Sequence, residues 1–345
     1  MRGPRVGLYD HPAFRAHDSG SGHPERPARL DAVRRGVQEA GLDSRLLDLS
    51  PRAATDDELR AVHTPAHVAG VAATAGRTVR FDPDTQAGPR SHEAALLAAG
   101  AVVDAVDRVL AGALDRAFCA VRPPGHHATA DRAMGFCLFN NVAVGAARAL
   151  AAGLRRVAVV DFDVHHGNGT QDIFYGDPRV LYVSSHAYPF YPGTGALDEI
   201  GEGAGRGFTV NLPLPSAMGD GDYARIYREV VTPVVRAFDP ELVLVSAGFD
   251  PHRDDPLAGM AVTERGFAQV AASCLEGAAG AAQGRAVFVL EGGYDLDGIA
   301  ASSSAVLSAM LGDPVAPARE EARRIDPLIE LYRRQLSAYW PVIAG

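Results

Sequence analysis

Short apolar runs alternate with helix-like stretches along this chain, and this alternation limits the possible folds more than any other feature of the sequence. The runs are almost continuously apolar, which is the pattern of strands buried on both faces of a sheet. They are RVGLY at 5–9, AFCAV at 117–121, VAVVD at 157–161, VLYVS at 180–184, LVLVS at 242–246 and AVFVL at 286–290. We therefore expect six strands of a mainly parallel sheet.

Helix signals fill the stretches between these runs. Gly41, Gly153 and Gly280 stand just past the expected ends of three helices, where glycine commonly ends a helix. The expected helices span 26–40, 91–110, 140–152, 222–238 and 263–279. Alternating strands and helices predict a three-layer α/β/α architecture with the sheet in the middle. Residues 314–323 predict a surface connection to a last helix at 325–339, and we expect one domain over residues 1–345.

Polar clusters follow four of the predicted strands at the point where each strand ends. They are RPPGHHA from residue 122, DFDVHHGNG from 161, GFDPHRDDP from 248 and EGGYD from 291. The carboxyl ends of parallel strands meet at one edge of a sheet, where loops from several strands converge and ligands bind. The sequence therefore predicts an active site at this edge.

The first candidate site is a metal centre built around Asp163 and His165. Alternate residues of an extended segment point the same way, so these two side chains can face one cation, with Asp161 on the same side. Carboxylate and imidazole ligands suit Zn²⁺ or Fe²⁺, and a third ligand from another loop leaves a position open for water. Asp250 is the natural third ligand. A lone acidic residue after a strand is usually a cap or turn former, but costly polar groups converging on an apolar strand end favour a metal.

A histidine pair and a tyrosine are the other candidates. His126 and His127 follow two prolines and a glycine, so the backbone presents both rings in a rigid loop, where imidazoles can act as acid and base. Tyr294 follows two glycines, and its phenol could donate a hydrogen bond to a developing oxyanion. We expect the histidines without such a setting to be surface or packing residues; these are His11, His17, His23, His63, His67, His92, His186 and His252.

Composition excludes several classes of protein. The net charge of -9 argues against a nucleic-acid partner, because phosphate binding normally needs a basic surface. All 33 basic residues are arginine, which removes lysine Schiff-base chemistry and the P-loop lysine. Three cysteines without CxxC spacing predict free thiols in a reducing compartment. The start of the chain does not resemble a signal peptide, and no apolar run reaches the roughly 18 residues of a membrane span, so we expect a cytoplasmic protein.

Seven segments carry a resemblance to a known family. They are HPERPARL, RPPGHHA, GFCLFNNVAVGA, VDFDVHHGNGTQDIFY, FYPGTG, VSAGFDPHRDDPLAGM and LEGGYD, and they run in the family's order between residues 22 and 311. In these segments the chain resembles the histone deacetylase family within the arginase/deacetylase fold. It looks closest to class II deacetylases and bacterial deacetylase-like amidohydrolases.

The resemblance implies roles for the predicted site residues. It implies that Asp163, His165 and Asp250 bind Zn²⁺, and that Asp161 orients His126 and helps to bind a structural K⁺ ion. His127 would be the general base and acid, and Tyr294 would polarise the acetyl carbonyl. The residues that it places around the substrate are Gly135 and Phe136 on one wall of an acyl-lysine tunnel, Tyr191 or Phe190 opposite, and Arg29 near the exit route of acetate.

Two positions bear on the subclass and the substrate. Class I enzymes place an aspartate behind the general base, where this chain has Asn168. Because asparagine is neutral, we expect the pKa of His127 to be lower than it would be beside an aspartate. Leu257 stands where polyamine-preferring relatives carry a glutamate, which favours an acetyl-lysine substrate over an acetylpolyamine.

The expected activity is zinc-dependent hydrolysis of an acyl amide, with release of acetate from acetyl-lysine or a related acetylated amine. Three alternatives stay open at this point. They are an acetylpolyamine amidohydrolase, a two-metal ureohydrolase like arginase, and a non-catalytic binder of acylated ligands. The sequence does not decide between Zn²⁺ and Fe²⁺, and it does not give the oligomeric state.

Overall fold

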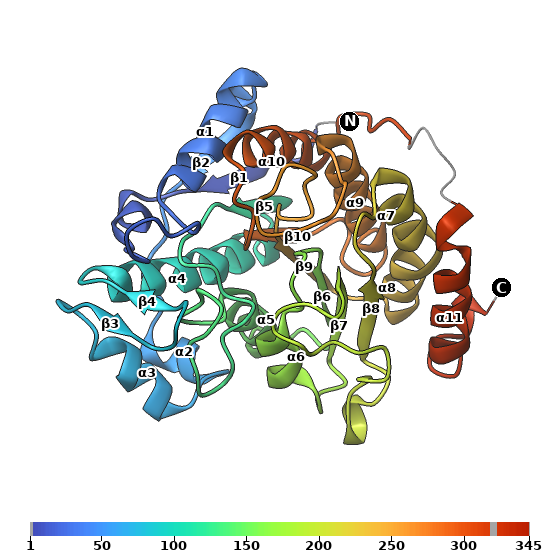
Figure 1. Cartoon of the computed structure of the whole chain (residues 1–345), viewed down its shortest axis with the longest axis horizontal. Helices are drawn as coiled ribbons and strands as arrows, with labels where there is room; N and C mark the ends of the chain where they lie inside the picture. Colours follow the sequence, from blue (N-terminus) through green and yellow to red (C-terminus); the bar gives the residue numbers. More distant parts are fainter. Residues whose placement is uncertain (1–2, 318–322, 345) are drawn as a thin grey trace.

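The computed structural model describes residues 3–317 and 323–344, and a single eight-stranded parallel sheet organises them (Figure 1). Every neighbouring pair of strands in this sheet runs parallel. In spatial order the strands are β2 (Leu46–Leu49), β1 (Val6–Tyr9), β5 (Arg116–Cys119), β10 (Ala286–Leu290), β9 (Leu242–Ala247), β6 (Val157–Asp161), β7 (Val180–Ala187) and β8 (Thr209–Leu214).

All six predicted strands are present, and they occupy the inner positions of the sheet. The five residues of β6 and the five of β10 are all buried, as continuous apolarity requires of a strand covered on both faces. The sequence analysis did not predict the two outermost strands. In β2 only Leu46 is fully buried, and β8 includes Pro213, so neither gives an unbroken apolar signal.

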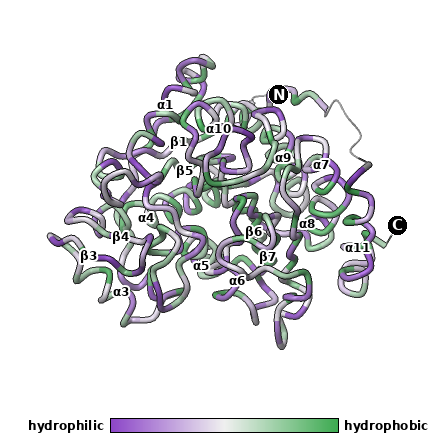
Figure 2. Tube along the Cα trace, viewed as in Figure 1, coloured by the Kyte–Doolittle hydropathy of each residue, from purple (hydrophilic) through white to green (hydrophobic). Residues whose placement is uncertain are grey.

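Helices cover both faces of the sheet. One layer contains α1 (Ala28–Glu39), α10 (Leu296–Met310), α9 (Glu264–Gly277), α7 (Asp220–Ile226) and α8 (Thr232–Phe238), which pack against one another in a continuous row (Figure 1). The other layer contains α4 (Ser91–Leu110), α5 (Asn141–Ala151) and α6 (Asn168–Phe174). In Figure 2 the outer helices alternate between hydrophilic and hydrophobic residues, as helices with one face on a core do. The predicted three-layer α/β/α architecture is confirmed.

Smaller elements complete the fold. They are α2 (Asp56–Arg60), α3 (Pro65–Ala72), α11 (Asp326–Leu336), the hairpin of β3 (Val79–Arg80) and β4 (Gln86–Ala87), and short 3-10 turns at Pro12–Ala16, Asp43–Arg45, Gly203–Gly205, Arg323–Ile325 and Pro341–Ile343. Within the predicted connection at 314–323, residues 318–322 lie outside the described residues. No helix in the described parts of the chain has both the length and the hydropathy that a membrane span requires.

The helix predicted at 222–238 is interrupted. It consists of α7, a π-helical turn at Tyr227–Val231 and α8. Pro233 lies at the start of α8 and has no N–H to donate to the carbonyl of Glu229, so a regular α-helical ladder fails at this point. The sequence analysis also missed α10, whose run of serines weakens the helical pattern and whose N-terminus is capped by Asp295.

Candidate active site

Four neighbouring strands deliver the predicted site residues to one edge of the sheet. In spatial order they are β5, β10, β9 and β6. The histidine pair follows β5, Tyr294 follows β10, Asp250 follows β9, and Asp163 and His165 follow β6. Because all four strands run parallel, their following loops converge, and residues 126 and 294 line the same cavity.

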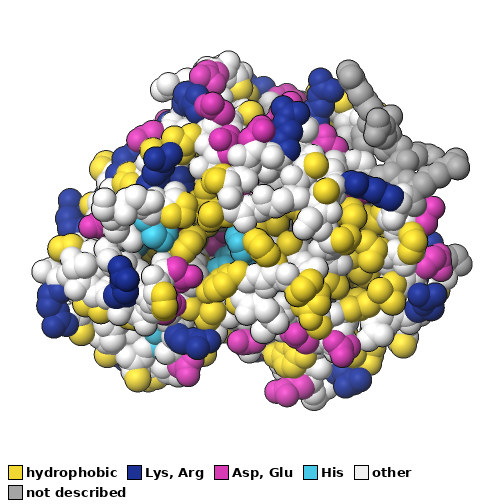
Figure 3. Space-filling view, in the orientation of Figure 1, with side chains coloured by type: hydrophobic (Ala, Val, Ile, Leu, Met, Phe, Trp, Pro, Cys, Tyr) yellow, Lys and Arg dark blue, Asp and Glu magenta, His cyan; other side chains and the backbone are white. Residues whose placement is uncertain are grey.

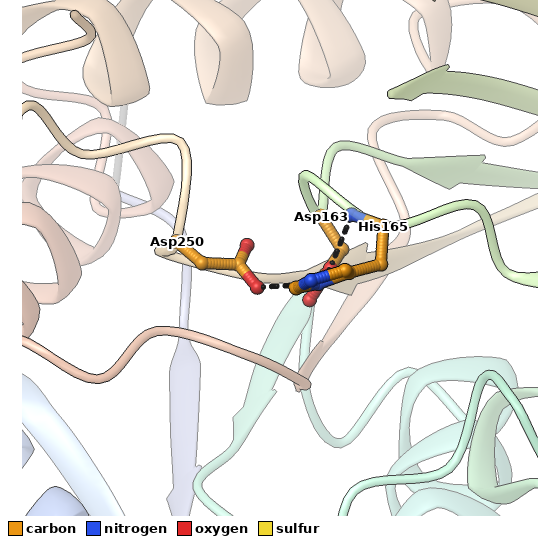
Figure 4. Close-up of side chains that lie close together, drawn as sticks. All are labelled: Asp163, His165 and Asp250. Atoms are coloured by element: carbon orange, nitrogen blue, oxygen red, sulfur yellow. Dashed lines mark hydrogen bonds and ion pairs between the residues drawn. The ribbon is translucent and has the colours of Figure 1, made fainter. Parts of the chain in front are cut away.

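Asp163, His165 and Asp250 form the one group in the described residues whose side chains could jointly hold a metal ion. Their ligand atoms all lie within 4.8 Å of one another, and Figure 4 shows the three side chains pointing toward a common point from two loops. The Nδ1 atom of His165 lies 3.1 Å from Asp163 Oδ1 and 3.0 Å from Asp250 Oδ2. Ligands about 2 Å from a tetrahedral zinc ion lie roughly 3.3 Å apart, so the spacing fits a single ion.

The charges of this group also fit a cation. Burial, reinforced by the nearby Asp163, raises the pKa of Asp250 to about 7. Burial would also raise the pKa of Asp163, but His126 and the hydrogen bonds from His165 outweigh burial and lower it. Burial lowers the pKa of His165, yet the two carboxylates raise it to about 10. The two buried carboxylates therefore favour a protonated His165, and a divalent cation that replaced this proton would balance their charge better. Two carboxylates with one imidazole are a ligand set that suits Zn²⁺ or Fe²⁺.

Two glycines let the backbone approach these carboxylates closely. A Cβ atom on Gly292 would lie 2.2 Å from Asp250 Oδ2, and one on Gly248 would lie 2.0 Å from Asp163 Oδ2. The amide of Gly292 also donates a hydrogen bond to Asp163 Oδ2 over 2.8 Å. These positions therefore exclude any side chain, and the glycines fix where the carboxylates stand.

His126 and His127 lie beside the metal group with their ring centroids 4.0 Å apart and their ring planes tilted by 46°, and each has its own partner. Nδ1 of His126 lies 3.0 Å from Asp161 Oδ2, whereas Nδ1 of His127 lies 2.9 Å from Asn168 Oδ1. An amide oxygen only accepts, so Nδ1 of His127 carries the proton and Nε2 is the unprotonated nitrogen.

The two imidazoles have very different pKa values because their surroundings differ. Burial would lower the pKa of His126, but Asp163 and Asp161 raise it to about 10. Burial, together with the charges of His126 and His165, holds the pKa of His127 well below its usual range. At neutral pH one imidazole is therefore cationic and its neighbour is a free base, which is the arrangement that acid–base chemistry requires.

Tyr294 is held on its turn from two directions. Gly293 has a φ of +107°, which only glycine adopts readily, and the amide of Tyr294 donates to Asp255 Oδ2 over 2.7 Å. On the other side, Arg29 donates from Nε to the carbonyl of Gly293 over 2.6 Å and from Nη2 to the carbonyl of Glu291. Burial raises the pKa of Tyr294 well above its usual range, so its hydroxyl stays a donor at neutral pH.

Arg29 is not exposed to the cavity, because its side chain is completely buried in an ionic cluster behind the turn. Glu25 lies between two arginines there: its carboxylate accepts hydrogen bonds from Arg29 Nη1 over 3.1 Å and from Arg122 Nε and Nη2. Ser19 donates a further bond to Glu25 over 2.7 Å. The Arg29 guanidinium carbon lies 5.1 Å from the centre of the Tyr294 ring, so the cluster forms the support of that side chain.

A cavity of about 240 Å³ connects the site to the surface. Figure 3 shows it as a hollow in the middle of the face, with histidine side chains inside and hydrophobic side chains around it. Its lining contains most of the predicted substrate residues. The lining residues are Asp84, Pro124, His126, His127, Gly135, Phe136, His165, Phe190, Tyr191, Leu257, Gly292 and Tyr294.

Aromatic side chains form the walls of this cavity. Phe136 meets the Tyr294 ring edge-on at 6.0 Å. Phe190 stacks on His165 at 5.3 Å, and Tyr191 meets His127 edge-on at 5.1 Å, so both candidates for the second wall line it. Gly135, with a φ of +56°, would place a Cβ atom 2.4 Å from the ring of His127, so the chain needs glycine there.

Sequence reasoning missed three acidic residues of the site. Asp255 holds the Tyr294 turn, and Asp84 lines the cavity. Glu291 accepts hydrogen bonds from the amides of Gly125 and His126, over 2.6 and 3.1 Å, and so fixes the histidine loop. Burial raises the pKa of Glu291 to about 7. The signal for Glu291 was its place at the end of a strand, which matched the places of the residues that were predicted.

The histidines expected to be surface or packing residues lie outside the metal group. His17, His63, His67, His186 and His252 are buried, and His63 and His186 bond to the carbonyls of Thr129 and Gly195. The second histidine of the DVHH motif, His166, contacts Thr194 and Gln171 rather than the metal group.

Comparison with known proteins agrees with the fold. A domain described as "Histone deacetylase domain" matches residues 23–310. A probable deacetylase of Archaeoglobus fulgidus is 38% identical over 96% of this chain and 93% of its own length. The polyamine deacetylase HDAC10 of Homo sapiens is 44% identical over 85% of this chain and 45% of its own length. The crystal structure of the HDA15 HD domain superposes with a TM-score of 0.90 at 39% identity, covering 99% of this chain and 96% of that one. The chain spans 54% and 59% of two Arabidopsis thaliana histone deacetylases that it matches.

Proposed function

Because the chain belongs to the histone deacetylase family, we propose that it is a metal-dependent amidohydrolase that removes the acetyl group from acetyl-lysine or a related acetylated amine. The observation that carries this proposal is that three parts of a hydrolytic site meet at one aromatic-walled cavity. They are the candidate metal ligands, the neutral imidazole of His127 and the protonated hydroxyl of Tyr294. Each of these three parts supplies something that amide hydrolysis needs.

The resident metal is proposed to be Zn²⁺, held by Asp163, His165 and Asp250. When bound, it would supply a Lewis acid for the amide carbonyl and lower the pKa of a water molecule to near neutrality. The resemblance to the family favours zinc over iron(II), which has the same donor preferences.

The side chains of this protein carry the proton transfers. Nε2 of His127 takes a proton from the attacking water, and the Tyr294 hydroxyl donates a hydrogen bond to the oxygen that becomes negative as the carbonyl is attacked. The C–N bond then breaks, the protonated imidazole of His127 returns the proton to the departing amine, and acetate forms. The buried hydrogen bond between His126 Nδ1 and Asp161 orients His126 and favours its imidazolium form beside His127.

The cavity walls favour an unbranched acylated chain. Phe136 and Tyr191 leave an apolar slot that suits the methylene groups of acetyl-lysine. Leu257 at the mouth offers no charge to a second ammonium group, which favours acetyl-lysine over an acetylpolyamine.

An acetylpolyamine remains the second candidate substrate. The carboxylate of Asp84 lines the same mouth and could hold a distant ammonium group, and a relative named as a polyamine deacetylase is 44% identical. An arginase-like two-metal enzyme receives no support, since in the described residues one group of side chains has metal-binding geometry. The structural K⁺ ion near Asp161, the single-domain organisation and the cytoplasmic location stay predictions.

Hydrolysis of a fluorogenic acetyl-lysine amide, measured together with bound metal by mass spectrometry, tests the proposed function. We expect one zinc ion per chain and acetate release that a chelator abolishes and added Zn²⁺ restores. Asp250→Asn should lose both the metal and the activity. Asp254→Asn is the matched control, because Asp254 lies on the same loop but is exposed and outside the metal group. Zinc-loaded protein that hydrolyses no acyl amide would contradict the proposal.

A further inference from the structure

A second cavity lies beside the mouth of the first. It has a volume of about 340 Å³ and is enclosed by the loop around residue 20 and by the β3–β4 hairpin. Asp84 lines both cavities, and the ring of His23 in the second packs edge-on against Phe136 of the first, with centroids 4.5 Å apart. The lining residues are Ser19, Gly20, Ser21, His23, Arg80, Pro83, Asp84, Thr85 and Gln86. The two cavities are therefore adjacent, with Asp84 in the wall of both.

The hairpin is tied to the wall of the first cavity. Thr85 donates its hydroxyl to the Asp84 carboxylate over 3.1 Å and accepts the amide of Phe136 over 3.1 Å. Asp82 accepts the amides of Asp84 and Thr85, over 3.0 and 2.6 Å, which closes the turn. The second cavity is thus fixed in place relative to the acyl-binding slot.

Three hydrogen-bonding side chains of the second cavity have no partner within the described parts of the protein. They are the guanidinium of Arg80, the hydroxyl of Ser21 and the amide of Gln86. Other polar groups of the lining are already engaged, since Ser19 donates to Glu25, and Thr85 donates to Asp84 and accepts from Phe136. The three unused side chains can all donate, and a guanidinium beside a hydroxyl and an amide suits a carboxylate.

The second cavity contains one positively charged and one negatively charged side chain that do not pair with each other. No salt bridge joins Arg80 to Asp84 in the described residues, although both line the same space. A ligand that carries a carboxylate and an ammonium group a few atoms apart would neutralise both, with the carboxylate on Arg80 and the ammonium on Asp84.

We propose that the second cavity binds the α-carboxylate and α-ammonium groups of a free Nε-acylated lysine whose acylated side chain occupies the aromatic-walled cavity. This inference rests on the proposed function and narrows its substrate to an acylated amino acid. A lysine within a peptide has neither charge at its α-carbon, and an acetylpolyamine has no carboxylate, so neither would use Arg80.

Calorimetric binding of three compounds tests this inference. They are Nε-acetyl-lysine, its α-carboxamide, which keeps the ammonium group but has a neutral amide in place of the carboxylate, and N-acetylcadaverine, which keeps the ammonium group and has nothing in place of the carboxylate. Binding is measured on the zinc-loaded Tyr294→Phe protein, which slows turnover, with and without Arg80→Gln. We expect Nε-acetyl-lysine to bind about tenfold more tightly than its carboxamide, and Arg80→Gln to remove that difference. Arg90→Gln is the control, because Arg90 is exposed, pairs with Glu93 and lines neither cavity; it should keep the difference.

The possible failures are separable. Equal affinity for Nε-acetyl-lysine and its carboxamide, or equal weakening of both by Arg80→Gln, would overturn the inference while leaving the deacetylase proposal intact. Tightest binding of N-acetylcadaverine would overturn it in favour of a simple amine substrate. Acetate release by the unsubstituted enzyme is measured separately. If no compound yields acetate but the Arg80-dependent preference persists, the proposed reaction fails and the amino-acid site stands.

Discussion

Replacing Glu25 by glutamine should unfold the protein at a clearly lower temperature. Glu25 is 1% exposed and is the shared counter-charge of two fully buried guanidiniums, Arg29 and Arg122. Glutamine has the same size, but it removes the charge and turns an N–H donor toward arginines that can only donate. Removing one partner of a buried ion pair costs about 3–5 kcal/mol.

That cost converts into a measurable shift in the melting temperature. An unfolding entropy of about 2.1 cal/mol/K per residue, over 345 residues, gives roughly 0.7 kcal/mol/K, so the shift is about 4–7 °C. Differential scanning fluorimetry at pH 7 measures it. Glu276→Gln is the matched control: Glu276 pairs with Arg236 on the surface, with both side chains about 60% exposed, and its loss should shift the melting temperature by about 1 °C or less.

The effect should also depend on pH in a defined direction. Burial would raise the pKa of Glu25, but Arg122 and His17 hold it well below its ordinary value of 4.5. The carboxylate therefore stabilises the fold fully above pH 4.5 and loses that contribution as the pH falls through the lower, folded-state pKa. The difference between the two proteins should stay constant from pH 5 to 8 and narrow below 4.5. A melting temperature within 1 °C of the unsubstituted protein at pH 7 would refute this account of the cluster.

Three further substitutions test the site. Tyr294→Phe removes the oxyanion donor, so kcat should fall about 10²-fold or more with little change in KM; full activity would exclude that role. Asn168→Asp places a carboxylate charge beside Nδ1 of His127, whose pKa lies well below its usual range, so the acidic limb of the kcat/KM profile should move up by about one pH unit. An unmoved limb would mean that another group titrates. Leu257→Glu should favour acetylspermidine over acetyl-lysine amide about fivefold in kcat/KM, the effect of an exposed ion pair near 1 kcal/mol. An unchanged ratio would place the second ammonium elsewhere.

The sequence predicted best those elements whose pattern is contained in a few neighbouring residues. The inner strands could be predicted because each is an unbroken apolar run, and the metal group because Asp163 and His165 stand two residues apart just after one of these runs. The extended segment expected to reach His165 was wrong: the strand ends at Asp161, and the chain bends at 163–165. The outer strands carry no such run, since β2 is half exposed and β8 contains a proline. The π-turn at 227–231 was missed because it depends on one absent N–H within an otherwise regular helical pattern.

The support of the site could not be predicted, because it depends on residues far apart in the chain. Glu25 and Arg122 are separated by 97 positions, and neither stands out among the charged residues of its own segment. Glu291 and Asp255 look like ordinary residues at strand and turn ends, and only the folded arrangement shows which amides they accept. Burial and pairing across the sheet edge are what turn these residues into structural supports.

The position of β10 in the sheet has a consequence for how the protein is made on the ribosome. This strand is the last of the eight in sequence, yet it lies between β5 and β9. A nascent chain that has not reached residue 286 therefore holds two separate pieces of sheet, with the facing edges of β5 and β9 bare. Bare strand edges pair readily with other chains, so the interval between translation of β9 and of β10 is when chaperone protection matters most. We expect a chain truncated in that interval to aggregate, because it keeps its hydrophobic core strands without the one that joins them.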